Sequence, residues 1–317
     1  MRKENKKKKL ISIVAPCYNE EENVEEIYNQ VKAVFKKLAD YDYEHIFIDN
    51  ASVDQTLSIL KGIAKRDRNV KIIENLKNFG WIRSPFYGIQ QAKGDAVILI
   101  ASDLQDPPAI IPKFIREWEK GRQIVVGVKQ RSKENFLMFG VRKFYYNLMD
   151  KIADTEHIRN FTSFGLYDQS FIEILRSLED PYPYLRGLVS ELSANYALVE
   201  YVQPKRRRGR SWSNFYRLYD VAMLGFVNHT KLPLRLASFI GFGVATISLL
   251  VAIVYLVYKL IHWNEFNAGI APLVIGLFFF SAVQLFFIGI IGEYIGAIFT
   301  QVRKRPLVIE KERVNFD

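Results

Sequence analysis

The sequence predicts an α/β fold, a doubly wound and mostly parallel sheet, followed by two membrane-spanning helices. Short apolar runs of β-rich composition alternate with amphipathic helical segments in the first part of the chain, which is typical of a parallel sheet. Two later runs, 236–258 and 266–292, contain no charged residue, and each exceeds the roughly 20 residues needed to cross a bilayer. A chain of 317 residues with 49% hydrophobic content can bury a large core.

The elements of the α/β part follow one another with short connections. Four strands are predicted, at 10–15, 45–48, 70–74 and 97–100. The first helix is predicted from apolar residues at helical spacing, namely Val24, Ile27, Val31, Val34 and Leu38. A second helix is predicted to begin near Thr56, and a third runs through 87–92 and ends at Gly94. The alternation indicates parallel strands joined by helical crossovers.

Composition divides the chain into four parts. We expect an α/β domain at 1–204, basic and amphipathic helices at 205–232, a two-helix transmembrane domain at 233–302 and a cytoplasmic tail at 303–317. Aromatic and apolar residues recur at near-helical spacing in the second part: Trp212, Phe215, Tyr216, Tyr219, Met223 and Phe226. This pattern favours a helix lying in the membrane interface over one packed on the α/β domain.

The charge distribution favours a membrane surface over nucleic acid. The net charge is +10, with basic residues concentrated at 6–9, at 206–210 and at 303–305, the last of these just after the second apolar run. The short connection 259–271 carries little positive charge, so the positive-inside rule places it outside and both termini in the cytoplasm. We therefore expect a multi-pass protein of the plasma (inner) membrane, with its α/β domain cytoplasmic and with no nucleic-acid partner.

Several classes of protein are excluded by what the sequence lacks. The single cysteine, Cys17, rules out an internal disulfide framework and is expected to be a small buried side chain. The four histidines have no zinc-ligand spacing. No glycine-rich phosphate loop follows the first strand, which argues against dinucleotide enzymes and P-loop NTPases.

Polar residues follow three of the predicted strands. The segments are PCYNE at 16–20, DNASVD at 49–54 and ASDLQD at 101–106. In open parallel sheets ligands bind beyond the carboxyl ends of the strands, so these segments are expected to meet in one crevice. Asp103 and Gln105 alternate along the chain and supply the oxygen ligands that Mg²⁺ or Mn²⁺ prefers. The alternative is an aspartate-rich turn that merely closes a strand.

Taken together, four motifs resemble the GT-A, family 2 inverting glycosyltransferases. They are PxYNE at 16–20, DNASxDxT at 49–56, KNFG at 77–80 and SDLQDPP at 102–108. Within this family the later part of the chain is similar to the polyisoprenyl-phosphate branch, the bactoprenol glucosyltransferases related to dolichol-phosphate mannose synthases. That likeness rests on Arg206, Gly209, Ser211, PLRL at 233–236, and GEYIGAIF with RKRP between 292 and 306.

The resemblance implies a role for individual residues. Pro16, Tyr18 and Glu20 would border the uridine, Asp49 would meet the uracil, and Asp103 and Gln105 would hold the metal and the diphosphate. The nucleotide-sugar set is Pro16, Tyr18, Glu20, Asp49, Lys77, Ser102 and Asp103. The catalytic set is Asp103, Gln105 and Asp154. The set for the acceptor phosphate is Lys129, Arg131, Arg206, Arg210 and Ser211; the basic run 206–210 is expected to divide between acceptor and membrane lipid.

Three positions depart from the family pattern. Ala101 and Asn50 stand where a carboxylate is usual, and TSFGLYD at 162–168 has Ser163 in place of an acidic residue. A lipid phosphate monoester is mostly dianionic at pH 7, because its second pKa is about 6, and so needs little help from a general base. Asp154, Glu156 and Asp168 are candidate helpers, but for each of them the sequence favours a solvated or capping carboxylate.

The expected function is transfer of a hexose, glucose from UDP-glucose, to undecaprenyl phosphate at the cytoplasmic membrane face, with inversion. One alternative is the same reaction with another donor such as GDP-mannose; another is a non-catalytic nucleotide-binding membrane scaffold. A processive polysaccharide synthase is disfavoured, because there is no QxxRW-like motif and there are only two spans. Gln284, the polar residue of the second span, is expected to pair with the first span or with another subunit of a homo-oligomer.

Overall fold

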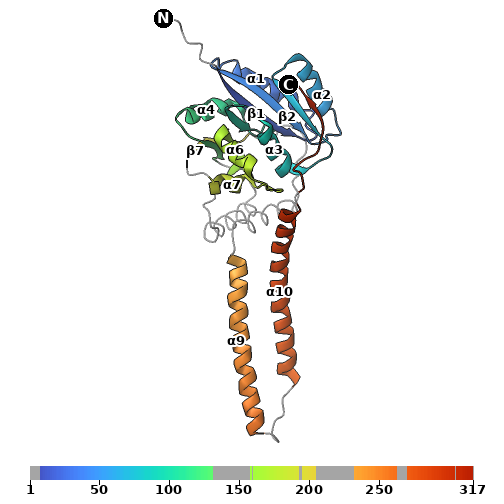
Figure 1. Cartoon of the computed structure of the whole chain (residues 1–317), viewed down its shortest axis with the longest axis vertical. Helices are drawn as coiled ribbons and strands as arrows, with labels where there is room; N and C mark the ends of the chain where they lie inside the picture. The colour runs from blue at the N-terminus through green and yellow to red at the C-terminus, as the bar shows by residue number, and fades with distance from the viewer. Residues whose placement is uncertain are drawn as a thin grey trace.

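The computed structural model describes residues 8–130, 158, 160–192, 195–204, 232–262, 270–303 and 305–316. An α/β domain lies at one end of the molecule, and two long helices extend from it (Figure 1). The domain is built on an eight-stranded sheet with the order β7-β5-β6-β4-β1-β2-β3-β8. The central strands of this sheet position the polar segments that the sequence analysis singled out.

The central strands are parallel, as the sequence predicts. The bounds are β1 Lys9–Cys17, β2 Tyr41–Asp49, β3 Val70–Asn75 and β4 Ala96–Leu99. Strand β1 pairs in parallel with β2 on one side and with β4 on the other, with Cys17 opposite Asp49 and Val14 opposite Leu99. The predicted strands are therefore confirmed, and β1 and β2 extend beyond their apolar runs at both ends.

The outer strands make the sheet mixed and were not identified in the sequence. Their bounds are β5 Ile124–Lys129, β6 Phe161–Asp168, β7 Tyr196–Tyr201 and β8 Glu310–Val314. Strand β6 runs antiparallel to both β4 and β5, whereas β7 is parallel to β5. The carboxyl ends of β5 and β7 consequently lie at the same edge of the sheet as those of β1, β2 and β4.

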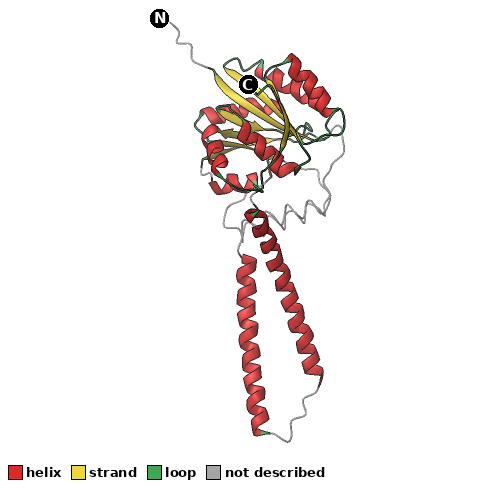
Figure 2. Ribbon diagram, turned by 45° about the vertical axis from the view of Figure 1, so that its right-hand side comes forward, coloured by secondary structure: helices red, strands yellow, loops and turns green. Residues whose placement is uncertain are grey.

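Helices cover both faces of the sheet (Figure 2). One face packs against α1 Val24–Phe35, α2 Thr56–Arg66, the short 3₁₀ turn η1 Pro108–Ile110 and α4 Ile111–Glu119. The other packs against α3 Gly80–Gln91, α6 Gln169–Ser177 and α7 Leu185–Leu192. Along β1 the side chains alternate between the layers, with Ile13 and Ala15 facing the first and Val14 the second. Helix α3 approaches closely at Gly88, where a Cβ would lie 1.9 Å from Ile48 Cδ1.

The two long helices are α9 Leu232–Ile261 and α10 Ile270–Val302. Within the described part of the chain, one segment, Phe279–Val302, is long and apolar enough to cross a membrane by length and composition. The expectation of two spans stays a prediction. A hollow of about 730 Å³ between α9 and α10 is lined by apolar side chains together with Ser238 and Gln284. Gln284 thus lies on the side of α10 that faces the first long helix.

The end of the chain returns to the sheet. Strand β8 pairs antiparallel with β3, and the Leu76 N–H donates to Ile309 O at 2.8 Å. The buried Glu74 carboxylate on β3 forms ion pairs with Lys311 and with Lys61. The sequence predicted a separate tail at 303–317; in the structure, residues 310–314 of that segment belong to the α/β domain.

His45 gives the α/β domain a built-in acid sensitivity. Its ring is fully buried in β2, and neither ring nitrogen has a hydrogen-bond partner in the part of the chain that the structure describes. Burial lowers the pKa of His45 to about 3, from an ordinary value near 6.5, although nearby Asp67 acts in the opposite direction. The unfolded chain therefore binds one more proton than the folded chain between these two pH values, and acid favours unfolding.

We expect stability to fall as the pH drops from about 6.5 toward 3, with a slope from this group of at most about 1.4 kcal/mol per pH unit. Thermal unfolding of the purified protein at pH 7 and pH 5 measures the effect. His45→Phe, which removes the titrating ring, should flatten this dependence; an unchanged slope in that variant would assign the acid sensitivity to other groups.

Candidate active site

The candidate site lies at the carboxyl edge of the sheet, where β4, β1 and β2 are neighbours. The segments that follow these strands are 18–23 after β1, 50–55 after β2 and 100–107 after β4. All three polar segments singled out in the sequence thus meet at one edge. The strand order, with β1 flanked by β2 and β4, is what brings together segments far apart in the chain.

The loops after β1 and β2 are tied to each other by hydrogen bonds. The Asn19 N–H donates to Ser52 Oγ at 2.9 Å, and the Val53 N–H donates to Asn19 Oδ1 at 2.9 Å. The Glu20 N–H donates to Thr56 Oγ1 at 2.8 Å, at the start of α2. Asn19 and Ala51 have positive φ angles of 54° and 59°. The two loops therefore form one fixed rim on which Tyr18 and Glu20 lie.

Asp49 lies at the bottom of this rim. Its side chain is fully buried at the end of β2, and its Oδ2 accepts the Ser52 N–H at 3.0 Å. Burial raises the pKa of Asp49 above its ordinary value, and hydrogen bonds from Ser52 partly offset that shift. A buried carboxylate with a fixed orientation is suited to accept a hydrogen bond from a planar N–H group such as that of a nucleobase.

Asn50 explains one departure from the family pattern. Its Oδ1 accepts the Phe79 N–H at 2.9 Å and Asn75 Nδ2 at 3.0 Å. Its Nδ2 donates to Asn78 Oδ1 at 3.1 Å and to Gly80 O at 3.2 Å. A carboxylate could accept the first pair but could not donate the second. The amide therefore holds the KNFG loop, on which the exposed Lys77 lies with its ammonium 5.3 Å from the centre of the Phe79 ring.

The loop after β4 carries the candidate metal ligands. Asp103 Oδ1 accepts the Gln105 N–H at 3.1 Å, which closes a turn through Leu104 at φ 61°. Ser102 Oγ donates to Pro16 O at 2.9 Å and so joins this loop to the end of β1. Asp103 and Gln105 are thereby held in one turn beside the β1 loop.

Asp106 braces the same loop, a role that the sequence analysis did not assign. Its side chain is buried, Oδ2 accepts the Ala101 N–H at 3.1 Å, and Oδ1 accepts the Tyr201 hydroxyl at 2.9 Å. Burial raises the pKa of Asp106 to about 6, although the hydrogen bonds act in the opposite direction. The sequence marks this position only by the run DPP at 106–108. It does not reveal the hydrogen-bond partner of Asp106, because Tyr201 lies on a strand 95 residues later.

The donor set fits a metal shared with substrate rather than a cage made by protein alone. Within the described ranges no three Asp, Glu, His or Cys side chains gather to hold an ion. Asp103 Oδ2 makes no hydrogen bond to the described residues, while both oxygens of Asp106 are occupied. One carboxylate with a neighbouring amide matches the habit of Mg²⁺ and Mn²⁺, which take further ligands from water and substrate phosphates.

The predicted acceptor residues are only partly within the described chain. Lys129 ends β5 at the active edge and lies close enough to Asp106 to oppose the rise in its pKa. Outside the described residues lie Arg131, Asp154, Glu156, Arg206, Arg210 and Ser211.

Asp168 does not belong to the site. It pairs with Ala96 at the start of β4, at the opposite edge of the sheet. Its Oδ2 accepts Trp118 Nε1 at 2.7 Å, and its Oδ1 accepts the Ser170 N–H at 2.9 Å as the N-cap of α6. The capping role that the sequence analysis favoured over a helper role is confirmed for this residue, because β6 is antiparallel and carries its last residue away from the strand ends.

Ser163, at the start of β6, lies on the correct edge. It has φ 73°, and its carbonyl accepts the Tyr167 hydroxyl at 2.8 Å. Arg186 Nε approaches its Oγ at 3.4 Å. A guanidinium therefore lies next to the position where the family pattern has an acidic residue.

Cys17, as expected, is a buried thiol. Its Sγ donates to Ile48 O at 3.4 Å, and burial raises its pKa.

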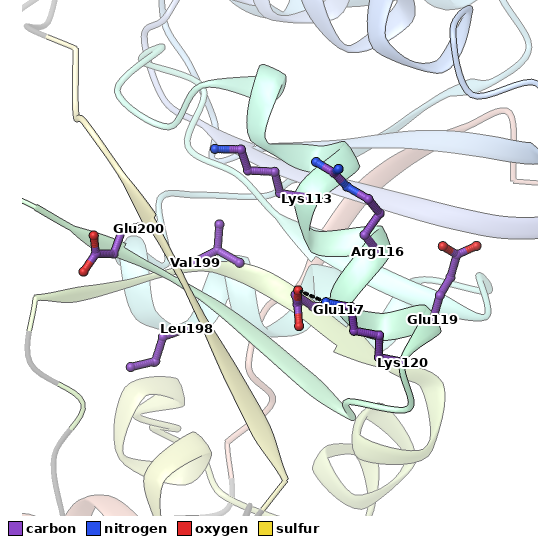
Figure 3. A pocket seen from close by; sticks show the side chains of 8 residues that line it. All are labelled: Lys113, Arg116, Glu117, Glu119, Lys120, Leu198, Val199 and Glu200. Atoms are coloured by element: carbon purple, nitrogen blue, oxygen red, sulfur yellow. Dashed lines mark hydrogen bonds and ion pairs between the residues drawn. The ribbon is translucent and has the colours of Figure 1, made fainter.

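A separate surface hollow of about 610 Å³ lies between α4 and β7 (Figure 3). Lys113, Arg116, Glu117, Glu119, Lys120, Leu198, Val199 and Glu200 line it. Glu117 and Lys120 form an ion pair within it, so opposite charges neutralise each other there. None of its lining residues belongs to the loops after β1, β2 or β4.

Comparison with known proteins agrees with this geometry. Residues 12–175 match the family model described as Glycosyl transferase family 2. The chain belongs to this family. The glycosyltransferase is 34% identical over 303 residues to the SfII prophage-derived bactoprenol glucosyl transferase of Shigella flexneri, covering 95% of this chain and 97% of that one. It is 31% identical over 302 residues to a prophage bactoprenol glucosyl transferase homolog of Escherichia coli K12, covering 95% and 98%.

The fold is also found among solved structures. The crystal structure of mannosyl-3-phosphoglycerate synthase from Rubrobacter xylanophilus matches with a TM-score of 0.51 and 16% identity. The match covers 69% of the glycosyltransferase and 72% of that protein. This likeness concerns the α/β domain, which has the GT-A fold with a mostly parallel sheet.

Proposed function

We propose that this glycosyltransferase transfers glucose from UDP-glucose to undecaprenyl phosphate, with inversion, at the cytoplasmic face of the inner membrane. One observation carries the proposal: the similarity to bactoprenol glucosyl transferases extends over nearly the whole chain, including the long apolar helices, and not only over the GT-A domain. A lipid acceptor lies in the membrane and therefore accounts for the long apolar helices, whereas a soluble acceptor would not.

The donor would lie across the rim formed by the loops after β1 and β2 and reach the neighbouring loop after β4. Pro16, Tyr18 and Glu20 would border the uridine, the buried Asp49 would accept a hydrogen bond from the uracil, and Ser102 and Lys77 would lie along the diphosphate. Asp103 and Gln105 would hold Mg²⁺ or Mn²⁺ together with the diphosphate, and the ion would neutralise charge on the departing UDP. The hydrogen bonds that fix these loops preorganise the site before substrate arrives.

The reaction would be a single displacement. An oxygen of the lipid phosphate attacks the anomeric carbon as the bond from that carbon to the UDP oxygen breaks, so the configuration inverts. A phosphate dianion is already deprotonated at neutral pH. This accounts for a site with Ser163 and Arg186, rather than a carboxylate, beside the start of β6.

The proposal includes the arrangement in the membrane. Helices α9 and α10 would be the two spans, and the GT-A domain and both termini would lie in the cytoplasm. Strand β8 supports this placement, because the residues after α10 pair with the same sheet that the N-terminal half builds. Both ends of the helical pair must then lie on the side that holds the domain.

The full-length protein in lipid nanodiscs, given radiolabelled UDP-glucose, undecaprenyl phosphate and Mg²⁺, should yield a lipid-extractable labelled product. Omitting the lipid phosphate, or adding EDTA, should abolish it. A parallel series with GDP-mannose and other nucleotide sugars identifies the donor. If no nucleotide sugar gives a lipid product, the proposed transfer is wrong and the nucleotide-binding scaffold becomes the better account.

A further inference from the structure

Two arginines near the active edge have no acidic partner among the described residues. Arg83 lies in the first turn of α3, and Arg186 lies in the first turn of α7. Neither forms an ion pair with any described residue. Within the described ranges, Arg186 donates one hydrogen bond, to Ser163 Oγ, and the buried Nε of Arg83 has no partner. The Arg83 guanidinium stacks over the Tyr182 ring at 5.3 Å. Partly buried guanidinium groups without a counter-charge are costly unless a ligand supplies one.

The position of Ser163 places Arg186 at the reaction site. Strand β6 runs antiparallel to β4, with Gly165 opposite Leu99. Ser163 therefore lies beyond the end of β4, at the level of the loop that carries Asp103. Helices α3 and α7 pack on the same face of the sheet, so Arg83 and Arg186 approach this edge from one side.

The segment that leads into Arg186 also reaches the long helices. Gln301, in the last turn of α10, donates to Asp180 Oδ1 at 3.1 Å. Tyr182, two residues after Asp180, is the aromatic partner of Arg83. Figure 1 shows α7 at the end of the domain that faces α9 and α10. Residues 180–186 therefore run from the domain end of α10 to the edge of the active site.

We propose that Arg186 binds the phosphate of the lipid acceptor, with Arg83 supplying a second positive charge nearby. This rests on the proposed function and adds a binding residue to it, since the sequence pointed only to Lys129, Arg131, Arg206, Arg210 and Ser211. A guanidinium presents parallel N–H donors that match two phosphate oxygens. The Nε–H of Arg186 donates to Ser163 Oγ, and this hydrogen bond orients the planar guanidinium. The terminal N–H groups of the guanidinium can then bind the anion.

The path of the acceptor favours its phosphate over the diphosphate of the donor. A lipid headgroup held at the domain end of α10 would meet residues 180–186 first. The donor rim lies on the other side of β4, on the loops after β1 and β2. Arg186 on the β6 side and the donor rim on the β1 side would then hold the two reacting groups on opposite sides of the Asp103 loop.

The test measures substrate affinities separately in Arg186→Gln. We expect the KM for undecaprenyl phosphate to rise about 10- to 100-fold, the loss that accompanies one or two hydrogen bonds to a charged group. The Kd for UDP, measured by calorimetry, and the thermal unfolding temperature should stay within about twofold and about 2 °C of the unmodified protein. Arg186→Lys keeps the positive charge but loses the paired N–H donors of the guanidinium. Its KM for undecaprenyl phosphate should therefore lie between those of the unmodified protein and Arg186→Gln.

The matched control is Arg116→Gln on the exposed surface of α4, which should leave both affinities unchanged. An unchanged acceptor KM in Arg186→Gln overturns the assignment. If the Kd for UDP rises as much as the acceptor KM, Arg186 binds the donor diphosphate instead, and the proposal is wrong. If that variant unfolds, Arg83→Gln must raise the acceptor KM without affecting UDP binding, or the proposal is rejected. Absence of lipid product from the unmodified protein would defeat the proposed function itself.

Discussion

Asp103→Asn is expected to lower kcat by about 10²- to 10³-fold, the usual cost of removing one electrostatic contact to a developing charge. The asparagine keeps an oxygen that can accept the Gln105 N–H, so the turn through Leu104 can persist while the negative charge is lost. The expected loss therefore reflects weaker binding of metal and diphosphate rather than a misfolded loop. Initial rates over a range of Mg²⁺ and Mn²⁺ concentrations measure it.

Asp42→Asn is a suitable control for that experiment. Asp42 lies near the start of β2, at the opposite edge of the sheet, and its side chain is 64% exposed. Its replacement should leave the rate and the metal dependence unchanged. Should Asp103→Asn retain more than about half of the activity at every metal concentration, the loop after β4 would not be the metal site.

Asp106→Ala is expected to lower the free energy of unfolding by about 2–4 kcal/mol, because it leaves the Ala101 N–H and the Tyr201 hydroxyl without their acceptor in a buried place. The same change should reduce activity, since the loop that carries Asp103 loses its brace. Denaturant unfolding and initial rates on the same preparation measure both effects.

Tyr201→Phe separates the two hydrogen bonds. It removes the hydroxyl but keeps the packing of the ring against Phe164, so we expect a loss of only about 1 kcal/mol. It should also preserve most of the activity, because the Ala101 N–H still reaches Asp106. Equal losses in Tyr201→Phe and Asp106→Ala would show that the contact to β7, rather than the contact within the loop, holds the site.

The central sheet was predictable because its strands are buried on both faces. Continuous apolar runs such as that of β4 need no partner information to be recognised as strands. Strand β8 has the opposite character. Its sequence EKERV carries four charges and no alternation. It is a strand through its antiparallel pairing with β3, where Glu74 and Lys61 on other elements form ion pairs with its side chains. Such ion pairs depend on the folded arrangement and have no signature in the local sequence.

The candidate site was predictable to a similar extent. Topology alone brings strand-end segments together, so the positions of Asp49 and Asp103 followed from the order of strands and loops. The roles of Asn50, Asp106 and Arg186 did not, because each depends on which donor or acceptor lies within hydrogen-bonding distance in space. Their partners are Phe79, Tyr201 and Ser163, and local sequence patterns do not reveal such pairings.

The position of β8 at the end of the chain has a consequence for biosynthesis. A ribosome releases the β3 edge long before it makes residues 310–314, and both long helices are translated in between. During that interval the buried Glu74 lacks Lys311, and the backbone of β3 lacks its neighbour. The sheet can be completed only after α9 and α10 have left the ribosome, so a chain truncated within the helices lacks the strand that covers the β3 edge.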